Sequence, residues 1–101
     1  MDRNGYNASI LQGFERYCYL TNSKNCDLIR HEIYYGLKNR DISKKNGFWV
    51  YLRPEIHNMR KDSVHQDKAL DLRLKKECQR KYEETHTREE FVKLIGRNYL
   101  E

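Results

Sequence analysis

The chain has 101 residues, of which 35% are charged and 38% are hydrophobic. This length suits one domain with a modest core and is too short for two. Lys and Arg outnumber Asp and Glu by 20 to 15, for a net charge of +5, which is compatible with a polyanionic partner such as nucleic acid. No apolar run approaches the roughly 20 residues that a membrane span requires. The composition therefore argues against a membrane protein.

The N-terminus and the cysteines bear on the compartment. Residues 1–5 lack the apolar core of a secretory signal. The three cysteines are an odd number, which fits a reducing compartment better than a disulfide framework. They are Cys18, Cys26 and Cys78. We therefore expect a soluble protein of the cytoplasm with no membrane association.

The first third of the chain contains one clear element. Residues 1–8 are polar, and we expect a flexible or loosely docked N-terminus. From Ser9 to Tyr19 apolar residues occur without a clean period, and Gly13 disfavours a helix. Residues 22–25 have the composition of a turn. Residues 28–35 are rich in β-branched, aromatic and apolar side chains, which predicts a strand that ends at Gly36.

The middle of the chain predicts a second strand. Residues 37–47 are polar and basic, which favours a loop with room for one helical turn. Residues 48–52 form the clearest strand pattern in the sequence. Pro54 ends this strand, and Pro54 with Glu55 can open a helix, because proline suits the first helical turn.

The last third of the chain predicts helices. Apolar residues recur every four positions at Leu70, Leu74, Cys78 and Tyr82. Thr87 and Glu90 match a capping box, which marks the start of a further helix. That helix has an apolar stripe at Phe91, Leu94 and Ile95. Gly96 is its expected C-cap. The outline is a strand pair followed by helices, which is the α+β class.

Three of the four histidines bracket the strand pair and the turn that follows it: His31, His57 and His65. Neutral imidazole is the commonest ligand of a catalytic metal ion and the usual general base near neutral pH. A strand carrying His31, paired with strand 48–52 and followed by a turn through His57 to His65, can bring the three together. That is the layout of a ββα-metal site, in which a divalent cation binds a scissile phosphate and a base activates water. Otherwise the three are unrelated polar residues.

Several segments in a fixed order carry a family resemblance. They are Ser9-Ile10-Leu11-Gln12, Arg30-His31-Glu32-Ile33-Tyr34-Tyr35-Gly36, Asn39-Arg40, Trp49-Val50-Tyr51-Leu52-Arg53-Pro54-Glu55, His57-Asn58-Met59, Val64-His65, Phe91 and Gly96-Arg97-Asn98-Tyr99-Leu100. Together they resemble the small HNH-type nuclease-like proteins that are common in bacteriophages and prophages. The resemblance runs from Ser9 to Leu100, nearly the whole chain.

The resemblance implies one HNH-like domain over residues 9–101, with a ββα core at about 28–66 and a helical part at about 67–100. It also implies a His-His pair at the end of the first strand, in which the first histidine binds the metal and the second is the general base. His31 takes the first position and Glu32 the base position, while His57 and His65 are the later metal ligands. If the alignment with this pair is shifted by one residue, which we call the shifted register, His31 is the base and Arg30 falls on the ligand position, where it cannot bind the metal. The number of residues between His31 and Gly36 favours the first register, and both registers stay open.

The chain departs from the family pattern at the structural zinc knuckle. Related proteins often carry two CxxC pairs, which would fall at residues 18–21 and 53–56 of this chain. Only Cys18 is present among the four thiolate positions. A tetrahedral thiolate site cannot form there, so we expect no structural zinc. Aromatic packing by Tyr17, Tyr19 and Trp49 is expected to hold the unit instead.

The second departure is Glu32. A carboxylate with an ordinary pKa of about 4.3 is a weak base near pH 7 unless burial raises that pKa. A bound cation would lower the pKa of the carboxylate instead. Glu32 could also ligate the metal.

Basic residues surround the histidines in the sequence. We expect six of them to contact phosphates, because Lys and Arg supply the sequence-independent part of nucleic-acid affinity; the other interpretation is a solvated surface. They are Lys38, Arg40, Lys44, Lys45, Arg60 and Lys61.

Two functional hypotheses follow. The first is a phage-derived, HNH-type endonuclease that hydrolyses DNA phosphodiester bonds with one divalent metal ion, which would be Mg, Mn, Ni or Zn. The second is a module that keeps the fold without catalysis and binds DNA, or a phage or host protein, as an accessory or inhibitory factor. Both place the protein in the cytoplasm of an infected or prophage-carrying bacterium, and neither predicts an oligomeric state.

Overall fold

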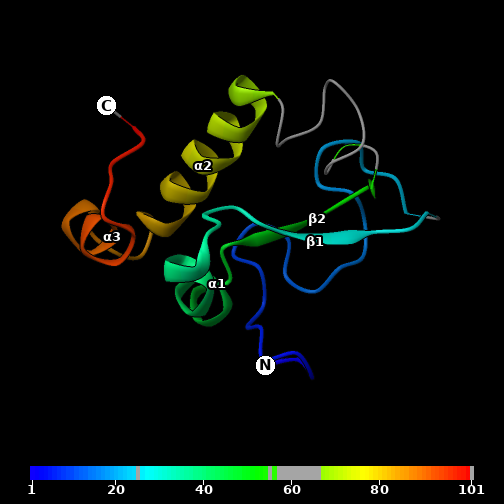
Figure 1. The fold of residues 1–101 in the computed structure, drawn as a ribbon, viewed down its shortest axis with the longest axis horizontal. Coiled ribbons are helices and arrows are strands. Elements are labelled where there is room, and N and C mark those ends of the chain that lie inside the picture. Colours follow the sequence, from blue (N-terminus) through cyan, green and yellow to red (C-terminus); the bar gives the residue numbers. More distant parts are fainter. Residues whose placement is uncertain (25, 55, 57–66, 101) are drawn as a thin grey trace.

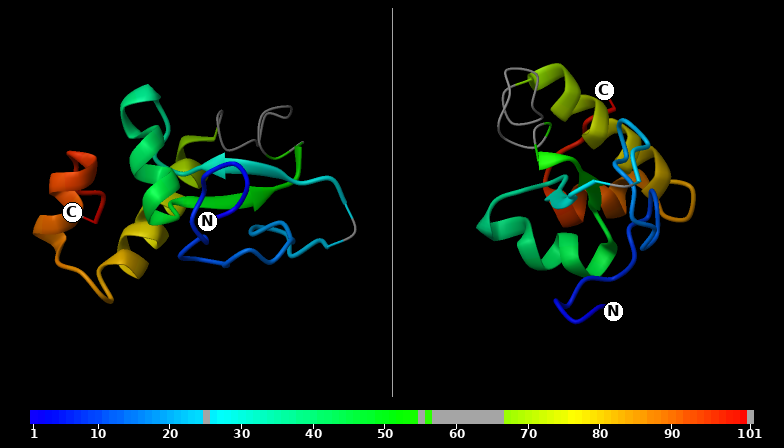
Figure 2. Two further views of the ribbon diagram at one scale, coloured as in Figure 1. Left: turned by 90° about the horizontal axis from the view of Figure 1, so that it is seen from below. Right: turned by 90° about the vertical axis from the view of Figure 1, so that its right-hand side faces the viewer.

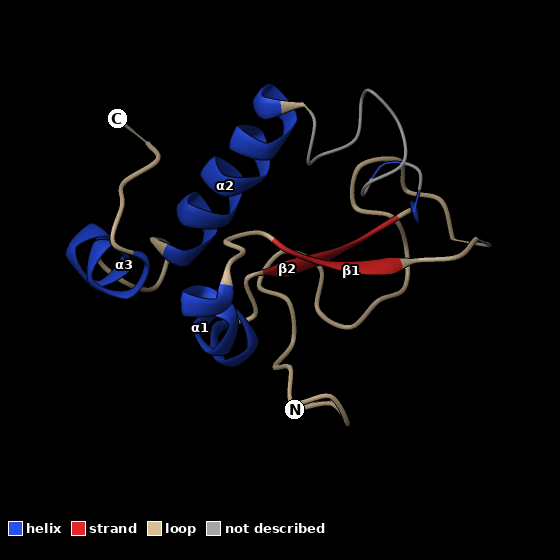
Figure 3. Cartoon of the chain, viewed as in Figure 1, coloured by secondary structure: helices blue, strands red, loops and turns tan. Residues whose placement is uncertain are grey.

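Two antiparallel strands form the centre of the fold (Figure 1). In the computed structural model, which describes residues 1–24, 26–54, 56 and 67–100, β1 spans Ile29–Glu32 and β2 spans Trp49–Leu52. The register pairs Ile29 with Leu52, Arg30 with Tyr51, His31 with Val50 and Glu32 with Trp49. Both predicted strands are confirmed, with shorter bounds. The described part of the chain adds three α-helices, so the α+β class is confirmed as well (Figure 3).

The connection between the strands is helical. It consists of the 3-10 helix η1, Leu37–Asn39, and the helix α1, Arg40–Asn46, which ends at Gly47 in the left-handed conformation. The prediction of a loop with one helical turn is wrong. Helix α1 has only seven residues, and its one buried side chain is Ser43, whose hydroxyl donates to the Tyr34 carbonyl at 3.1 Å. A helix this short, anchored by a serine, leaves no apolar period to recognise in the sequence.

Two helices form the last third, as predicted. Helix α2 spans Lys68–Tyr82 and helix α3 spans Arg88–Ile95. Asp67 caps α2, since its carboxylate accepts from the amides of Ala69 and Leu70. The capping box at the start of α3 is present, and Gly96 ends that helix in the left-handed conformation. The expected caps of α3 are therefore confirmed.

The main core lies between the sheet and α2. The predicted stripe of α2 packs there, with Leu74 and Cys78 fully buried, Tyr82 nearly so and Leu70 partly buried. Tyr34, which follows β1, lies at the centre of the aromatic packing. Its ring centroid is 5.4 Å from that of Phe48 and 5.3 Å from that of Phe91, and its hydroxyl donates to the Lys75 carbonyl at 2.6 Å. The helical part is thus attached to the strands by apolar and aromatic contacts.

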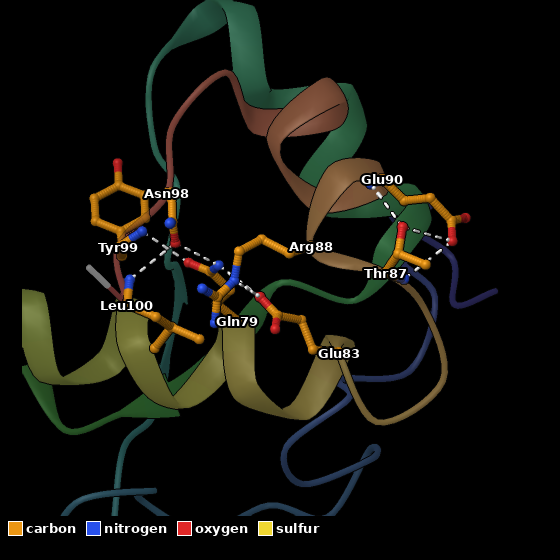
Figure 4. A network of polar contacts seen from close by, with 8 residues as sticks. All are labelled: Gln79, Glu83, Thr87, Arg88, Glu90, Asn98, Tyr99 and Leu100. Carbon is orange, nitrogen blue, oxygen red and sulfur yellow. Dashed lines mark hydrogen bonds and ion pairs between the residues drawn. The ribbon is translucent and has the colours of Figure 1, made fainter.

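A polar network fixes the C-terminal segment to α2 (Figure 4). The buried Gln79 side chain donates to Glu83 at 2.7 Å and to the Asn98 side chain at 2.9 Å. Its carbonyl oxygen accepts from the Tyr99 amide at 2.8 Å. Arg88, at the start of α3, contacts the same Glu83 carboxylate at 3.3 Å. One buried glutamine therefore joins α2 to the chain that follows α3.

Irregular chain before β1 covers the outer edge of β2. The Ser9 hydroxyl donates to the Trp49 carbonyl at 2.5 Å, and the Gln12 side chain accepts from the Tyr51 amide at 2.8 Å. The Tyr19 amide donates to the Tyr51 carbonyl at 2.9 Å. These bonds occupy backbone donors and acceptors on the outer edge of β2, which would otherwise be open to pairing with another strand. Figure 2 shows this segment, in blue, running beside the strand pair.

The first eight residues contact the face of the sheet opposite α2. Tyr6 is buried there with Trp49 and Tyr51, and Asp2 forms an ion pair of 2.7 Å with Arg30. These contacts do not measure mobility, so the expected flexibility of residues 1–8 stays a prediction. The division at about residue 66 also stays a prediction, because residues 57–66 lie outside the described residues. None of the described helices combines the length and apolar character needed to cross a bilayer.

Candidate functional site

His31 lies on the face of β1 that meets α2. Its side chain is 1% exposed, and its strand partner is Val50, a residue of the main core. The centroid of its ring is 6.2 Å from that of Tyr35. The Tyr35 hydroxyl donates to Asp71 of α2 at 3.3 Å, and Lys75 Nζ lies 4.6 Å from the Tyr35 ring. The buried imidazole is therefore close to the first turns of α2.

Glu32 lies on the other face of the same strand, because successive side chains of a strand alternate. Its carboxylate accepts from the Tyr6 hydroxyl at 2.6 Å, and Arg40 Nε lies 3.8 Å from the same oxygen. Burial, together with this hydrogen bond, raises the pKa of Tyr6 above its usual value. The structure therefore does not bring His31 and Glu32, the two predicted catalytic side chains, to one side of the sheet.

The other predicted metal ligands, His57 and His65, lie outside the described residues. Within the described ranges, no group of three His, Cys, Asp or Glu side chains could hold a metal ion. The donors on the α2 face suit a divalent cation chemically, since they include the His31 imidazole. Asp71 Oδ1, a carboxylate oxygen of the first turn of α2, is buried without a hydrogen-bond partner in the described part of the chain. The described residues could thus supply part of a metal site.

The three thiols lie in separate surroundings. Cys18 is fully buried before β1, and Cys78 is fully buried in the core on α2. Burial alone would raise the pKa of the Cys18 thiol, but hydrogen bonds from Thr21 and nearby backbone lower it. Burial raises the pKa of Cys78. The expected lack of a structural zinc stays a prediction. Trp49 is buried and Tyr19 packs against the main core, which agrees with the expected aromatic packing.

The predicted basic residues divide between several surfaces. Arg40 and Lys44 of α1 line one cavity, whereas the neighbouring Lys45 lines another with Asn46. Lys38 is exposed on η1. Arg60 and Lys61 lie outside the described residues. The basic segment is thus a helix whose charges point in different directions, not one continuous rim.

The cavity beside Arg40 and Lys44, here the α1 cavity, has a volume of about 510 Å³. The described residues that line it include four cations and no acid. They are Asn4, Tyr6, Arg16, Leu28, Arg30, Arg40, Lys44 and Tyr51. Sequence reasoning missed the contributions of Arg16 and Arg30. The two-residue period of β1 could have placed Arg30 beside Tyr51, but no sequence signal connects Arg16 to this face.

Arg30 is the centre of this face. Its guanidinium carbon lies 4.2 Å from the Tyr6 ring centroid and 4.3 Å from that of Trp49. Its Nη2 contacts Asp2 at 2.7 Å and the Tyr51 hydroxyl at 3.2 Å. Hydrogen bonds from the Tyr6 amide and from Arg30 lower the pKa of Asp2. The arginine is therefore held in one place by rings and by one carboxylate.

Comparisons with protein-family models, with curated proteins and with solved structures found no match to the chain.

Proposed function

We propose that the protein is a metal-dependent, HNH-type endonuclease of phage origin that hydrolyses DNA phosphodiester bonds in the bacterial cytoplasm. In this proposal β1, β2 and α2 are the ββα-metal unit. The observation that carries it is His31, an imidazole buried on the α2 face of the sheet. A ββα-metal site needs a histidine on that strand and on that face.

The path of the chain supports this assignment. Residues 53–67, which include His57 and His65, join the end of β2 to the start of α2. The last residue of β2, Leu52, pairs with Ile29, two positions before His31. In the first turn of α2, Asp71 binds Tyr35, whose ring is next to that of His31. The segment with the two further histidines therefore leaves and rejoins the described fold close to His31.

The proposed metal ligands are His57 and His65, with His31 either as the third ligand or, in the shifted register, as the base. One divalent ion would stabilise the charge that develops on the scissile phosphate and on the leaving oxygen. The described residues leave two roles for His31, since it is a ligand if Glu32 is the base and is itself the base in the shifted register. The position of Glu32 on the opposite face, bonded to Tyr6, favours the shifted register.

Plasmid nicking by the purified chain with Mg²⁺, Mn²⁺, Ni²⁺ or Zn²⁺ tests the proposal, with an active His-His relative as the positive control. We expect cleavage that His31→Ala abolishes and that His86→Ala, at an exposed turn histidine, retains. Calorimetry with the metal separates the two roles. His31→Ala should bind metal weakly if His31 is a ligand and normally if it is the base. Glu32→Gln should abolish cleavage only if Glu32 is the base. Absence of plasmid cleavage by the wild-type chain, under conditions in which the His-His relative cuts, refutes the proposal.

A second function is favoured by one observation. The Glu32 carboxylate is engaged by the Tyr6 hydroxyl at 2.6 Å and faces away from His31. A chain that has lost the base would keep the fold and bind DNA without cutting it. We expect this module to bind a DNA duplex equally well with and without EDTA. Binding that requires a divalent metal ion would contradict it.

A further inference from the structure

We propose that the α1 cavity is a binding site for the phosphate group of a nucleotide. Four cationic side chains from three separate parts of the chain converge on it. Arg16 comes from the irregular N-terminal segment, Arg30 from β1, and Arg40 and Lys44 from α1. No carboxylate is among the described residues that line it, so this part of the cavity is a concave surface of one charge.

The positive charge of the cavity is only partly compensated. Asp2 pairs with Arg30 at 2.7 Å, and Glu32 lies at the long distance of 3.8 Å from Arg40. Within the described residues, neither Arg16 nor Lys44 forms an ion pair. Two full charges therefore remain available to an anion at a site where protein already displaces part of the surrounding water.

Tyrosine rings hold the cations in place before any ligand arrives. The Arg16 guanidinium carbon lies 4.9 Å from the centroid of Tyr51, and Lys44 Nζ lies 5.1 Å from that of Tyr6. An arginine over an aromatic ring uses the face of its guanidinium and keeps its in-plane N–H donors for a phosphate. Arg30 Nε is buried and has no acceptor in the described part of the chain. The donors are thus preorganised for an anion with several acceptor oxygens.

The size of the cavity indicates more than an inorganic anion. Its volume of about 510 Å³ is within the roughly 300–1,000 Å³ of small-ligand sites. A phosphate with its sugar is an appropriate occupant, either as a free nucleotide or as part of a strand. Arg30 and Tyr51 lie on the face opposite His31, so this site does not depend on the proposed nuclease site.

Calorimetry at low salt, without metal, tests the proposal with thymidine monophosphate, thymidine and oligothymidylate. We expect the monophosphate to bind and thymidine to bind at least about tenfold more weakly, because hydrogen bonds to charged groups dominate. Arg16→Gln and Lys44→Gln should each weaken binding about tenfold. Lys45→Gln is the matched control, since it removes the same charge from the adjacent residue of α1, outside this cavity, and should change affinity less than about twofold. Lys44→Arg should keep binding, and thermal melting verifies that each variant is folded.

The outcomes identify the source of the phosphate. Binding of both phosphate ligands supports a site open to free nucleotides, and binding of oligothymidylate alone supports a site for a strand. The proposal is overturned if neither ligand binds, if thymidine binds as well as its monophosphate, or if Lys45→Gln is as harmful as Lys44→Gln. Nucleotide binding that survives in His31→Ala would show that the two sites are separate. Wild-type binding without plasmid cleavage would refute only the nuclease proposal.

Discussion

Gly47→Ala should destabilise the fold far more than Gly96→Ala, although both glycines end a helix in the left-handed conformation. The φ angles are 69° at Gly47 and 85° at Gly96, so an alanine is strained at each position. A Cβ at Gly96 would meet nothing within 4 Å. A Cβ at Gly47 would lie 2.0 Å from the Ala8 carbonyl oxygen and 3.2 Å from the Ile10 amide nitrogen. Comparing the two variants therefore separates the cost of backbone strain from the cost of crowding by neighbouring atoms.

The magnitudes follow from these contacts. The left-handed conformation should cost an alanine roughly 1–2 kcal/mol at either position. At Gly47 the chain at Ala8 must also move by more than an ångström to restore ordinary contact. That movement would disturb two hydrogen bonds, from the Ile10 amide to the Gly47 carbonyl at 3.0 Å and from the Asn7 amide to the Lys44 carbonyl at 2.9 Å. At about 1 kcal/mol each, they should raise the cost for Gly47→Ala to roughly 3–4 kcal/mol.

Urea denaturation followed by the fluorescence of Trp49, the single tryptophan, measures both variants. A marginally stable domain has roughly 5–15 kcal/mol to lose, so a difference of about 2 kcal/mol between the variants is readily detected. If the two variants agree within about 0.5 kcal/mol, the N-terminal segment is not packed against Gly47 as described. That result would also weaken the evidence for the α1 cavity, because Tyr6 of the same segment lines it.

Three further predictions concern α2, α3 and the thiols. Leu74→Ala, at a fully buried site, should cost about 2–5 kcal/mol in urea denaturation. Leu72→Ala, at a 40% exposed site of the same helix, should cost less than about 0.5 kcal/mol, and equal costs would contradict the packing of α2. Hydrogen bonds from Thr87 lower the pKa of Glu90 below its usual 4.5, so the stability that Glu90 adds is present above that pH and lost as pH falls through the lowered pKa. The difference in melting temperature between wild type and Glu90→Gln should therefore shrink from pH 7 to about pH 3, and a constant difference would refute the role of the carboxylate. Brief alkylation of the folded protein should modify Cys26 before the fully buried Cys18 and Cys78, as read by mass spectrometry, and prior loss of Cys78 would contradict the described core.

Features that depend on local chemistry could be predicted from the sequence. The strand over 48–52 is an unbroken apolar run that is buried throughout, and the stripe through Leu74, Cys78 and Tyr82 has a four-residue spacing that matches its burial. The caps of α3 depend on Thr87, Glu90 and Gly96, which act within their own turns. Helix α1 and the edge contacts of β2 could not be found in this way. They depend on single side chains, such as those of Ser43 and Gln12, bonded to backbone far away in the chain.

The candidate site was predicted on the first strand without regard to the two faces of that strand. Motif reasoning treats Arg30, His31 and Glu32 as neighbours because they are adjacent in sequence. In a strand, adjacency separates side chains, and positions two apart lie together. The α2 face accordingly receives His31, while the opposite face receives Arg30 and Glu32, where Arg30 stacks on the rings of Tyr6 and Trp49.

This separation gives the two proposals a common consequence. Sites on opposite faces of one sheet that share no described side chain should respond independently to substitution. The effects of His31→Ala and Lys44→Gln on nucleotide affinity should then add as free energies, with His31→Ala contributing almost nothing. Strong coupling would mean that β1 transmits a change from one face to the other. The route would be through Glu32, which follows His31 in the sequence and contacts both Tyr6 and Arg40 of the α1 cavity.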